Sequence, residues 1–148
     1  MSELLGIARF KFHEGKREEY LRLADQAMDI VRTKDSGTLG YDLYLNGDQS
    51  ECMVIERYRD SEAAIEHAAN LGHLFPAVLA TVSVVHGELL GEPSTELRAQ
   101  SSERSWLAAK CRFSSLPTGH GGQDFTDARR VKPPQVDEAR VRRLNEQP

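Results

Sequence analysis

The feature that most constrains the fold is the hydrophobic period, which switches repeatedly between two residues and about 3.6 residues in the first part of the chain. Residues 4–12, LLGIARFKF, alternate as a strand does, and residues 16–32 place apolar side chains at helical spacing. Gly37 is expected in the left-handed position just beyond the end of that helix. Residues 38–46 and 51–59 alternate again and are joined through NGDQS, a strong hairpin signal.

A second helical segment and a last strand complete this pattern. Asp60 or Ser61 is expected to cap the second helix, which breaks near Gly72. The helical pattern resumes beyond the break, where Pro76 is tolerated in the first turn of a new segment. Strand composition returns at residues 81–91, so the predicted order is β-α-β-β-α-β.

This order predicts an α+β fold of the ferredoxin-like type, a four-stranded antiparallel sheet with both helices on one face. The other face of such a sheet is uncovered, although the strands are partly apolar on both sides. Because a monomer rarely tolerates a large exposed apolar face, we expect a homodimer that packs the two open faces together as a dimeric α/β barrel. A small-molecule pocket is expected beside each sheet.

The apolar residues are concentrated in residues 1–99, which we expect to form one domain. Residues 100–116 are expected to extend it with a short helix and a brief strand. Residues 117–148 carry many charges and little to bury, and are predicted to be a mobile C-terminal tail.

The charge distribution narrows the class of partner. Residues 1–99 contain 10 Lys and Arg against 17 Asp and Glu, a net charge of −7, and residues 100–148 have a net charge of +3. An acidic domain lacks the basic face with which proteins bind nucleic acids. Since no apolar stretch reaches the length of a membrane span and no secretion leader is recognisable, we expect a cytoplasmic protein without membrane association.

The cysteines and histidines do not predict a metal site. Cys52 and Cys111 make neither a disulfide framework nor a ligand cluster and are expected to be free thiols. His67 and His73 lack the spacing that would place two ligands on one helical face. No phosphate-binding loop is present in the sequence.

The chain resembles the antibiotic biosynthesis monooxygenase domain family of the dimeric α/β-barrel superfamily over about residues 4–91. The resemblance rests on Gly15 and Lys16 at the first helix, on the strands SGTLGYDLY and VIERYRD, and on the helix SEAAIEH with a second histidine. It implies a homodimer that oxygenates an aromatic, quinol-like or polyketide-derived substrate without metal, flavin or haem. Such a substrate loses a proton and its electron-rich anion passes an electron to oxygen, so the protein must bind, deprotonate and exclude water.

The resemblance makes His67 the first candidate base, because it lies where the family has a histidine facing the cavity, and a neutral imidazole suits proton abstraction. The alternative is an ordinary histidine near a helix end. His73 follows the Gly72 break and is the second candidate, pointing either to solvent or to the mouth of the pocket.

Seven further residues, Arg9 among them, are candidates for substrate contact. Glu56 falls on a mostly apolar strand face, where a carboxylate needs either a partner such as Arg9 or a chemical role. His86 on the last strand either projects into the barrel or bonds across strands, with the structural role favoured. The aromatic candidates are expected to line a pocket or to pack in the core; they are Tyr41, Tyr44, Tyr58 and Phe75.

Two other functions stay open beside the cofactor-independent monooxygenase. A non-catalytic dimeric ligand-binding or accessory protein of a biosynthetic pathway would use the same pocket as a receptacle. Haem degradation occurs in relatives that resemble one another in an Asn on the first strand and a Trp on the second helix. Here the strand offers Ala8 and Arg9, and His67 stands at what resembles the Trp position, so haem degradation is the least favoured.

Overall fold

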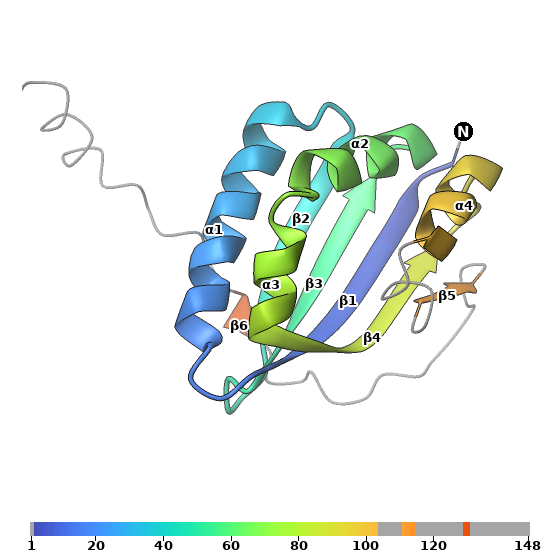
Figure 1. Ribbon diagram of the computed structural model, residues 1–148. Coiled ribbons are helices and arrows are strands. Elements are labelled where there is room, and N and C mark those ends of the chain that lie inside the picture. Colours follow the sequence, from blue (N-terminus) through green and yellow to red (C-terminus); the bar gives the residue numbers. More distant parts are fainter. Residues whose placement is uncertain (1, 104–110, 115–128, 131–148) are drawn as a thin grey trace, which may run out of the picture.

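The computed structural model describes residues 2–103, 111–114 and 129–130 of the 148-residue chain. The elements follow the order β1 (Leu4–Phe12), α1 (Arg17–Lys34), β2 (Thr38–Leu45), β3 (Glu51–Tyr58), α2 (Ser61–Leu71), α3 (Phe75–Thr81), β4 (Val82–Leu90), α4 (Thr95–Glu103), β5 (Cys111–Ser114) and β6 (Arg129–Arg130) (Figure 1). The predicted β-α-β-β-α-β order is confirmed, with α3 and α4 added to it.

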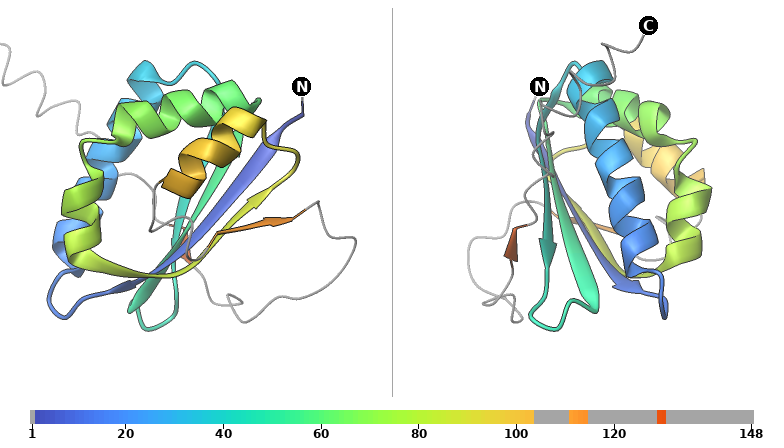
Figure 2. Two further views of the ribbon diagram at one scale, coloured as in Figure 1. Left: turned by 45° about the vertical axis from the view of Figure 1, so that its right-hand side comes forward. Right: turned by 90° about the vertical axis from the view of Figure 1, so that its left-hand side faces the viewer.

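The sheet has the strand order β5-β4-β1-β3-β2-β6. Its four long strands, β4, β1, β3 and β2, pair antiparallel, whereas β5 adds to β4 in parallel and β6 adds to β2 antiparallel. The helices lie on one face of this sheet (Figure 2). The fold is therefore the α+β ferredoxin-like arrangement expected from the sequence.

Two buried clusters hold the helices on the sheet. The larger one joins α1 to the middle of the sheet and contains Phe10, Tyr20, Ala24, Leu43, Leu45, Cys52, Val54 and Val82. The smaller one joins α2 and α4 to the ends of β1 and β3 and contains Leu4, Tyr58, Ala63, Ala64 and Leu97. Burial of these side chains is the main contribution to stability, at about 1.5–3 kcal/mol for each large apolar side chain.

The loop from α1 to β2 approaches α2 more closely than the sequence indicates. Gly37 does not have a positive φ angle, so the left-handed conformation expected there is wrong. Glycine is required for space instead, because a Cβ atom at this position would lie 2.5 Å from the Cβ of Ala63. The neighbouring Ser36 donates from its backbone N and its Oγ to Glu66 Oε2, at 2.9 and 2.8 Å. This loop is thus fixed against α2.

The starts of α2 and α3 follow their sequence signals. Asp60 caps α2, since its Oδ1 accepts a hydrogen bond of 2.9 Å from the backbone N of Ala63. Pro76 lies in the first turn of α3, where its missing N–H costs nothing. The N-terminal end of α2 is therefore fixed by a side-chain cap, whereas α3 begins without one.

The second face of the sheet is open within the described residues. Leu5, Ile7, Tyr44, Met53 and Ile55 alternate with the core residues of their strands and are all half-buried. They form a continuous apolar surface on β1, β3 and β2, which we call the open face. The strands are partly apolar on this side, as expected from the sequence.

The C-terminal extension begins with α4. The domain boundary predicted at residue 99 falls inside this helix, which continues to Glu103. Strand β5 lies within residues 100–116. Of residues 117–148, predicted as a mobile tail, all but Arg129 and Arg130 lie outside the described residues.

Candidate functional site

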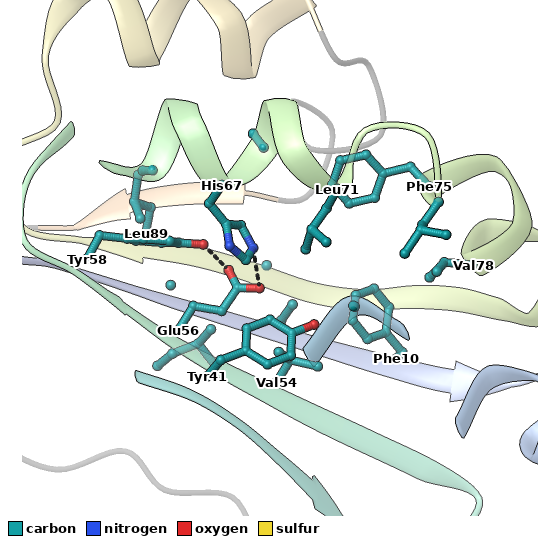
Figure 3. Close-up of a pocket in the computed structure, with 18 of the residues that line it drawn as sticks. Phe10, Tyr41, Val54, Glu56, Tyr58, His67, Leu71, Phe75, Val78 and Leu89 are labelled. Atoms are coloured by element: carbon teal, nitrogen blue, oxygen red, sulfur yellow. Dashed lines mark hydrogen bonds and ion pairs between the residues drawn. The ribbon is translucent and has the colours of Figure 1, made fainter. Parts of the chain in front are cut away.

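An elongated cavity lies between the helices and the strands of the sheet. Its volume is about 190 Å³, and its walls come from the four long strands on one side and from all four helices on the other. The lining is mostly apolar. Figure 3 shows Glu56, Tyr58 and His67 converging at one end, whereas Phe10, Phe75 and Val78 lie at the other. The cavity thus has a polar end and an apolar end.

Three different elements bring ionisable groups to the polar end. His67 projects from the middle of α2 and is only 4% exposed, because α2 lies flat on the sheet. Glu56 reaches up from β3 beneath it. Asp35 is the residue that ends α1, where the chain turns into extended backbone towards β2. Its carboxylate approaches the imidazole from the opposite side to Glu56.

The imidazole of His67 lies between two carboxylates. Its Nδ1 is 2.7 Å from Oδ2 of Asp35, a short hydrogen bond, and its Nε2 is 3.5 Å from Oε1 of Glu56, an ion-pair distance. A neutral imidazole carries one N–H and would turn a lone pair towards one of these carboxylates. The arrangement therefore favours the imidazolium form.

The pKa of His67 follows the same logic. Burial by itself lowers this pKa, but the hydrogen bond and negative charge of Glu56, followed by those of Asp35, outweigh burial and raise the pKa above its ordinary value of 6.5. The site therefore favours the imidazolium over the neutral imidazole that the sequence analysis expected of a base.

Both carboxylates are stabilised in the charged form. Burial raises the pKa of Glu56, but the hydrogen bond and charge of His67, with the hydrogen bond from Tyr58, bring the net pKa below its usual range. Burial likewise raises the pKa of Asp35, and hydrogen bonds from Asn70, Thr38 and His67 outweigh it, so the net pKa is lowered. The cluster of two carboxylates and one imidazolium has a net charge of −1.

Two tyrosines frame the cluster. The hydroxyl of Tyr58 donates to Oε2 of Glu56 at 2.5 Å, and its ring meets the His67 ring edge-on with centroids 5.3 Å apart. The ring of Tyr41 lies 5.7 Å from His67. Burial and then the charge of Glu56 raise the pKa of both phenols, so both remain protonated. Within the described part of the chain Tyr41 donates no hydrogen bond, and its hydroxyl points along the cavity (Figure 3).

The cavity includes five of the nine residues proposed from the sequence, which are Tyr41, Glu56, Tyr58, His67 and Phe75. His73 does not line it and is exposed, because it lies in the turn that separates α2 from α3.

Three other candidates belong to the opposite side of the sheet. Arg9 alternates with the cavity-lining residues of β1 and bonds Glu51, with Nε 2.7 Å from Oε2, so it is not the partner of Glu56. Tyr44 pairs with Met53 on the open face. His86 lies opposite Arg9 and 3.4 Å from Glu88. The structural role favoured for His86 agrees with this position.

Sequence reasoning missed Asp35, the second carboxylate of the cluster. It follows a helix and precedes Ser36 and Gly37, a context typical of a helix end, so its side chain carries no pattern that predicts a long-range partner. The signal that indicates a partner is the pairing of β2 beside β3, which brings the end of α1 over the same strand as Glu56.

Among the residues that the structure describes there is no group of three or more His, Cys, Asp or Glu side chains with the geometry to hold a metal ion. In the same part of the chain no helix is long and apolar enough to cross a membrane.

Comparison with known proteins places this geometry in context. The family model described as antibiotic biosynthesis monooxygenase matches residues 5–80. A comparison with curated proteins finds no match.

Several solved structures share the fold. MupZ from Pseudomonas fluorescens has a TM-score of 0.65 at 17% identity, over 82% of this chain and 96% of MupZ. Rv0793 from Mycobacterium tuberculosis has a TM-score of 0.53 at 27% identity, over 63% of this chain and 97% of Rv0793. SnoaB, a cofactor-independent oxygenase from Streptomyces nogalater, has a TM-score of 0.54 at 19% identity, over 64% of this chain and 97% of SnoaB.

Proposed function

This chain belongs to the antibiotic biosynthesis monooxygenase family, and we propose that it oxidises a small hydroxylated aromatic substrate with molecular oxygen, without a metal or organic cofactor. The observation that carries the proposal is the ionised Asp35–His67–Glu56 cluster at one end of an otherwise apolar cavity. The description of SnoaB as a cofactor-independent oxygenase supports the reaction class.

The reaction balances with one substrate and one O₂. The substrate hydroxyl gives its proton to Glu56, and the resulting phenolate passes one electron to O₂. Superoxide and the substrate radical then combine to form a C–O bond at a ring carbon. The resulting peroxide anion takes the proton back from Glu56 and becomes a hydroperoxide. The hydroperoxide loses the hydrogen of that carbon as a proton while the O–O bond breaks, which leaves a carbonyl and a hydroxide that this proton converts to water. For 1,5-dihydroxynaphthalene the products are a hydroxynaphthoquinone and H₂O.

Each residue at the polar end has a distinct role in this proposal. Glu56 is the proton acceptor, since it is ionised and its Oε1 faces the cavity beside His67. His67 is the cation that stabilises the phenolate and superoxide in a dry site, where a fixed charge acts more strongly than in water. Asp35 acts through His67 and is a positioning residue. Tyr41 donates its free O–H to the substrate oxygen.

Oxygen uptake tests the function directly. Purified protein, freed of metal with a chelator, should consume O₂ with hydroquinone or 1,5-dihydroxynaphthalene faster than the same solution without protein. With ¹⁸O₂, one labelled atom should appear in the quinone and the other in water. Uptake that never exceeds autoxidation for any member of the panel would refute the monooxygenase.

A non-catalytic ligand-binding protein is the second candidate. The binding role is favoured because Glu56 already has Tyr58 and His67 as partners. Its carboxylate is therefore stable in the cavity without a substrate. The Glu56→Gln variant separates the two functions. Binding retained with turnover lost supports catalysis, whereas a protein that binds 1-naphthol but consumes no oxygen supports the binding role.

We also propose that the protein is a homodimer that covers the open face. Five half-buried apolar residues on three adjacent strands support this assembly, since such a surface is costly in water. Light scattering should give twice the mass of the chain for the wild type. The Ile55→Arg variant, which places a charge at the centre of the open face, should shift the mass to that of the monomer, and a monomeric wild type would refute the dimer.

A further inference from the structure

The helix α4 closes the polar end of the cavity. Leu97, Gln100 and Ser101 all line it, and Leu97 packs with Tyr58 and Ala64 in the smaller buried cluster. Figure 2 shows α4 on the same side of the sheet as α2 and α3. Part of the cavity wall beside Tyr58 is therefore built by residues outside the range 5–80 that the family model matches.

The position of α4 is fixed at its start. The chain leaves β4 through Gly91, which has a φ of +112° and whose Cβ, if present, would lie 2.8 Å from Leu4. The backbone N of Ser94 then donates to Ser61 Oγ of α2 at 2.9 Å. Ser94 in turn accepts at its Oγ from the backbone N of Leu97 at 3.2 Å, which caps the helix. A wall anchored in this way imposes a definite length on the cavity.

The cavity is small. At about 190 Å³ it exceeds only modestly the cavity of about 150 Å³ that holds benzene in an engineered protein, and it falls below the range of about 300–1,000 Å³ for drug-sized ligands. One ring fits with room for substituents, and two fused rings nearly fill the space. Three fused rings require the α4 wall to move.

We propose that α4 sets the substrate size, with Leu97 as the specificity-determining residue, so that the cavity takes a hydroxylated aromatic of one or two rings and excludes three fused rings. The hydroxyl group in this inference rests on the proposed function, whereas the size limit holds for any ligand of the cavity. Leu97 determines size because its side chain is 7% exposed and fills the wall next to Tyr58.

The test is anaerobic titration calorimetry with phenol, 1-naphthol and anthrone, which measures binding without turnover. The wild type should bind phenol and 1-naphthol, and should bind anthrone at least tenfold more weakly than 1-naphthol. Leu97→Ala should raise the affinity for anthrone relative to that for 1-naphthol by about tenfold or more. The physical reason is that one methylene in a pocket changes discrimination between ligands by about 10–200-fold. Ser101→Leu should lower the affinity for 1-naphthol at least tenfold and leave the affinity for phenol within threefold of the wild type.

Two controls keep the test decisive. Leu43→Ala removes an equally buried leucine that does not line the cavity, so it should leave the ratio of anthrone to 1-naphthol affinities unchanged. If Leu97→Ala does not fold, Leu97→Val should still shift the ratio in the same direction by at least threefold.

Three results overturn the inference: wild type that binds anthrone within threefold of 1-naphthol, wild type that binds neither phenol nor 1-naphthol, or Leu97 variants that match Leu43→Ala. Binding in the expected order without any oxygen uptake would refute the monooxygenase and leave the size limit standing.

Discussion

The two faces of the sheet use the same types of side chain in opposite ways. On the outer side His86 lies 3.4 Å from Glu88, and their side chains are 44% and 25% exposed. On the covered side His67 lies 2.7 Å from Asp35, and their side chains are 5% and 0% exposed. Both are histidine–carboxylate pairs, but only the second is removed from water.

This difference in burial changes what each pair contributes. Water screens an exposed pair, so such a pair contributes about 0–1 kcal/mol to the free energy of unfolding. Removal of one partner from a buried pair lowers that free energy by about 3–5 kcal/mol. A charged cluster that costs this much to bury, at the end of a cavity, is a candidate for chemistry rather than for stability alone. The comparison therefore favours the covered face as the location of the proposed function.

The largest effect is expected from Glu56→Gln, which keeps the shape of the side chain and removes the proton acceptor. Loss of a general base typically lowers the rate by about 10²–10⁴-fold, so oxygen uptake with 1,5-dihydroxynaphthalene should fall by this factor. The matched control is Glu51→Gln, a carboxylate on the outer side of the same strand. Equal losses in the two variants would show that the two faces do not differ in function.

The next effect concerns stability. His67→Phe leaves two carboxylates without their shared cation and should lower the free energy of unfolding by about 3–5 kcal/mol, measured by urea denaturation. His86→Phe should change it by at most about 0.5 kcal/mol, because its partner stays hydrated. If the two variants lose the same free energy, burial does not distinguish the two pairs.

The pH dependence tests the charge assigned to His67. The pKa of His67 is raised, so its stabilising effect is complete below its ordinary pKa of 6.5 and is lost as pH rises through the higher pKa of the folded state. The pKa values of Asp35 and Glu56 are lowered, so their effect is present above their ordinary values of 3.8 and 4.5 and is lost as pH falls through the lower folded values. The free-energy difference between wild type and His67→Phe should therefore be largest between about pH 4.5 and 6.5.

The catalytic rate should also decrease as pH rises through the raised pKa of His67. With His67 as a cation, kcat stays constant through pH 6.5 and declines above the raised pKa. The Asp35→Asn variant removes one of the two anions, so the decline should begin at lower pH than in the wild type. A rate that instead increases through pH 6.5 would indicate a neutral histidine base and contradict the imidazolium.

The smallest effect is expected on the outer side. Arg9→Met removes the ion pair with Glu51, whose side chains are 32% and 17% exposed, and should change the free energy of unfolding by no more than about 1 kcal/mol. Oxygen uptake should stay within twofold of the wild type. A larger loss of activity would mean that Arg9 reaches the substrate from a second chain and would move part of the site to the open face.

The sequence predicted the fold well because alternation and helical spacing are local properties. The strand β1 and the hairpin of β2 and β3 have the predicted positions. Alternation does not predict burial where the strand register shifts. Strict alternation places Leu39 on the same face as the buried Leu43. The pairing of β2 with β3 shifts between Thr38 and Gly40, however, and Leu39 is 46% exposed.

The site was predicted only in part, because its geometry depends on contacts between elements distant in the sequence. His67 was found through the family resemblance, and Glu56 because a carboxylate on an apolar strand face requires an explanation. Their pairing, and the third member Asp35, depend on how α1 and α2 lie over β3. The protonation state follows from that pairing, and for this reason the neutral histidine expected from an ordinary pKa does not fit.

Gly37 has a consequence for natural variation. Even the single methyl group of alanine at this position would collide with Ala63 and push α2 away from the α1–β2 loop. His67 is carried on that helix and Asp35 on that loop, so their 2.7 Å contact would separate. Among homologues that keep the acid–histidine contact, position 37 should therefore tolerate no residue but glycine, although it does not line the cavity.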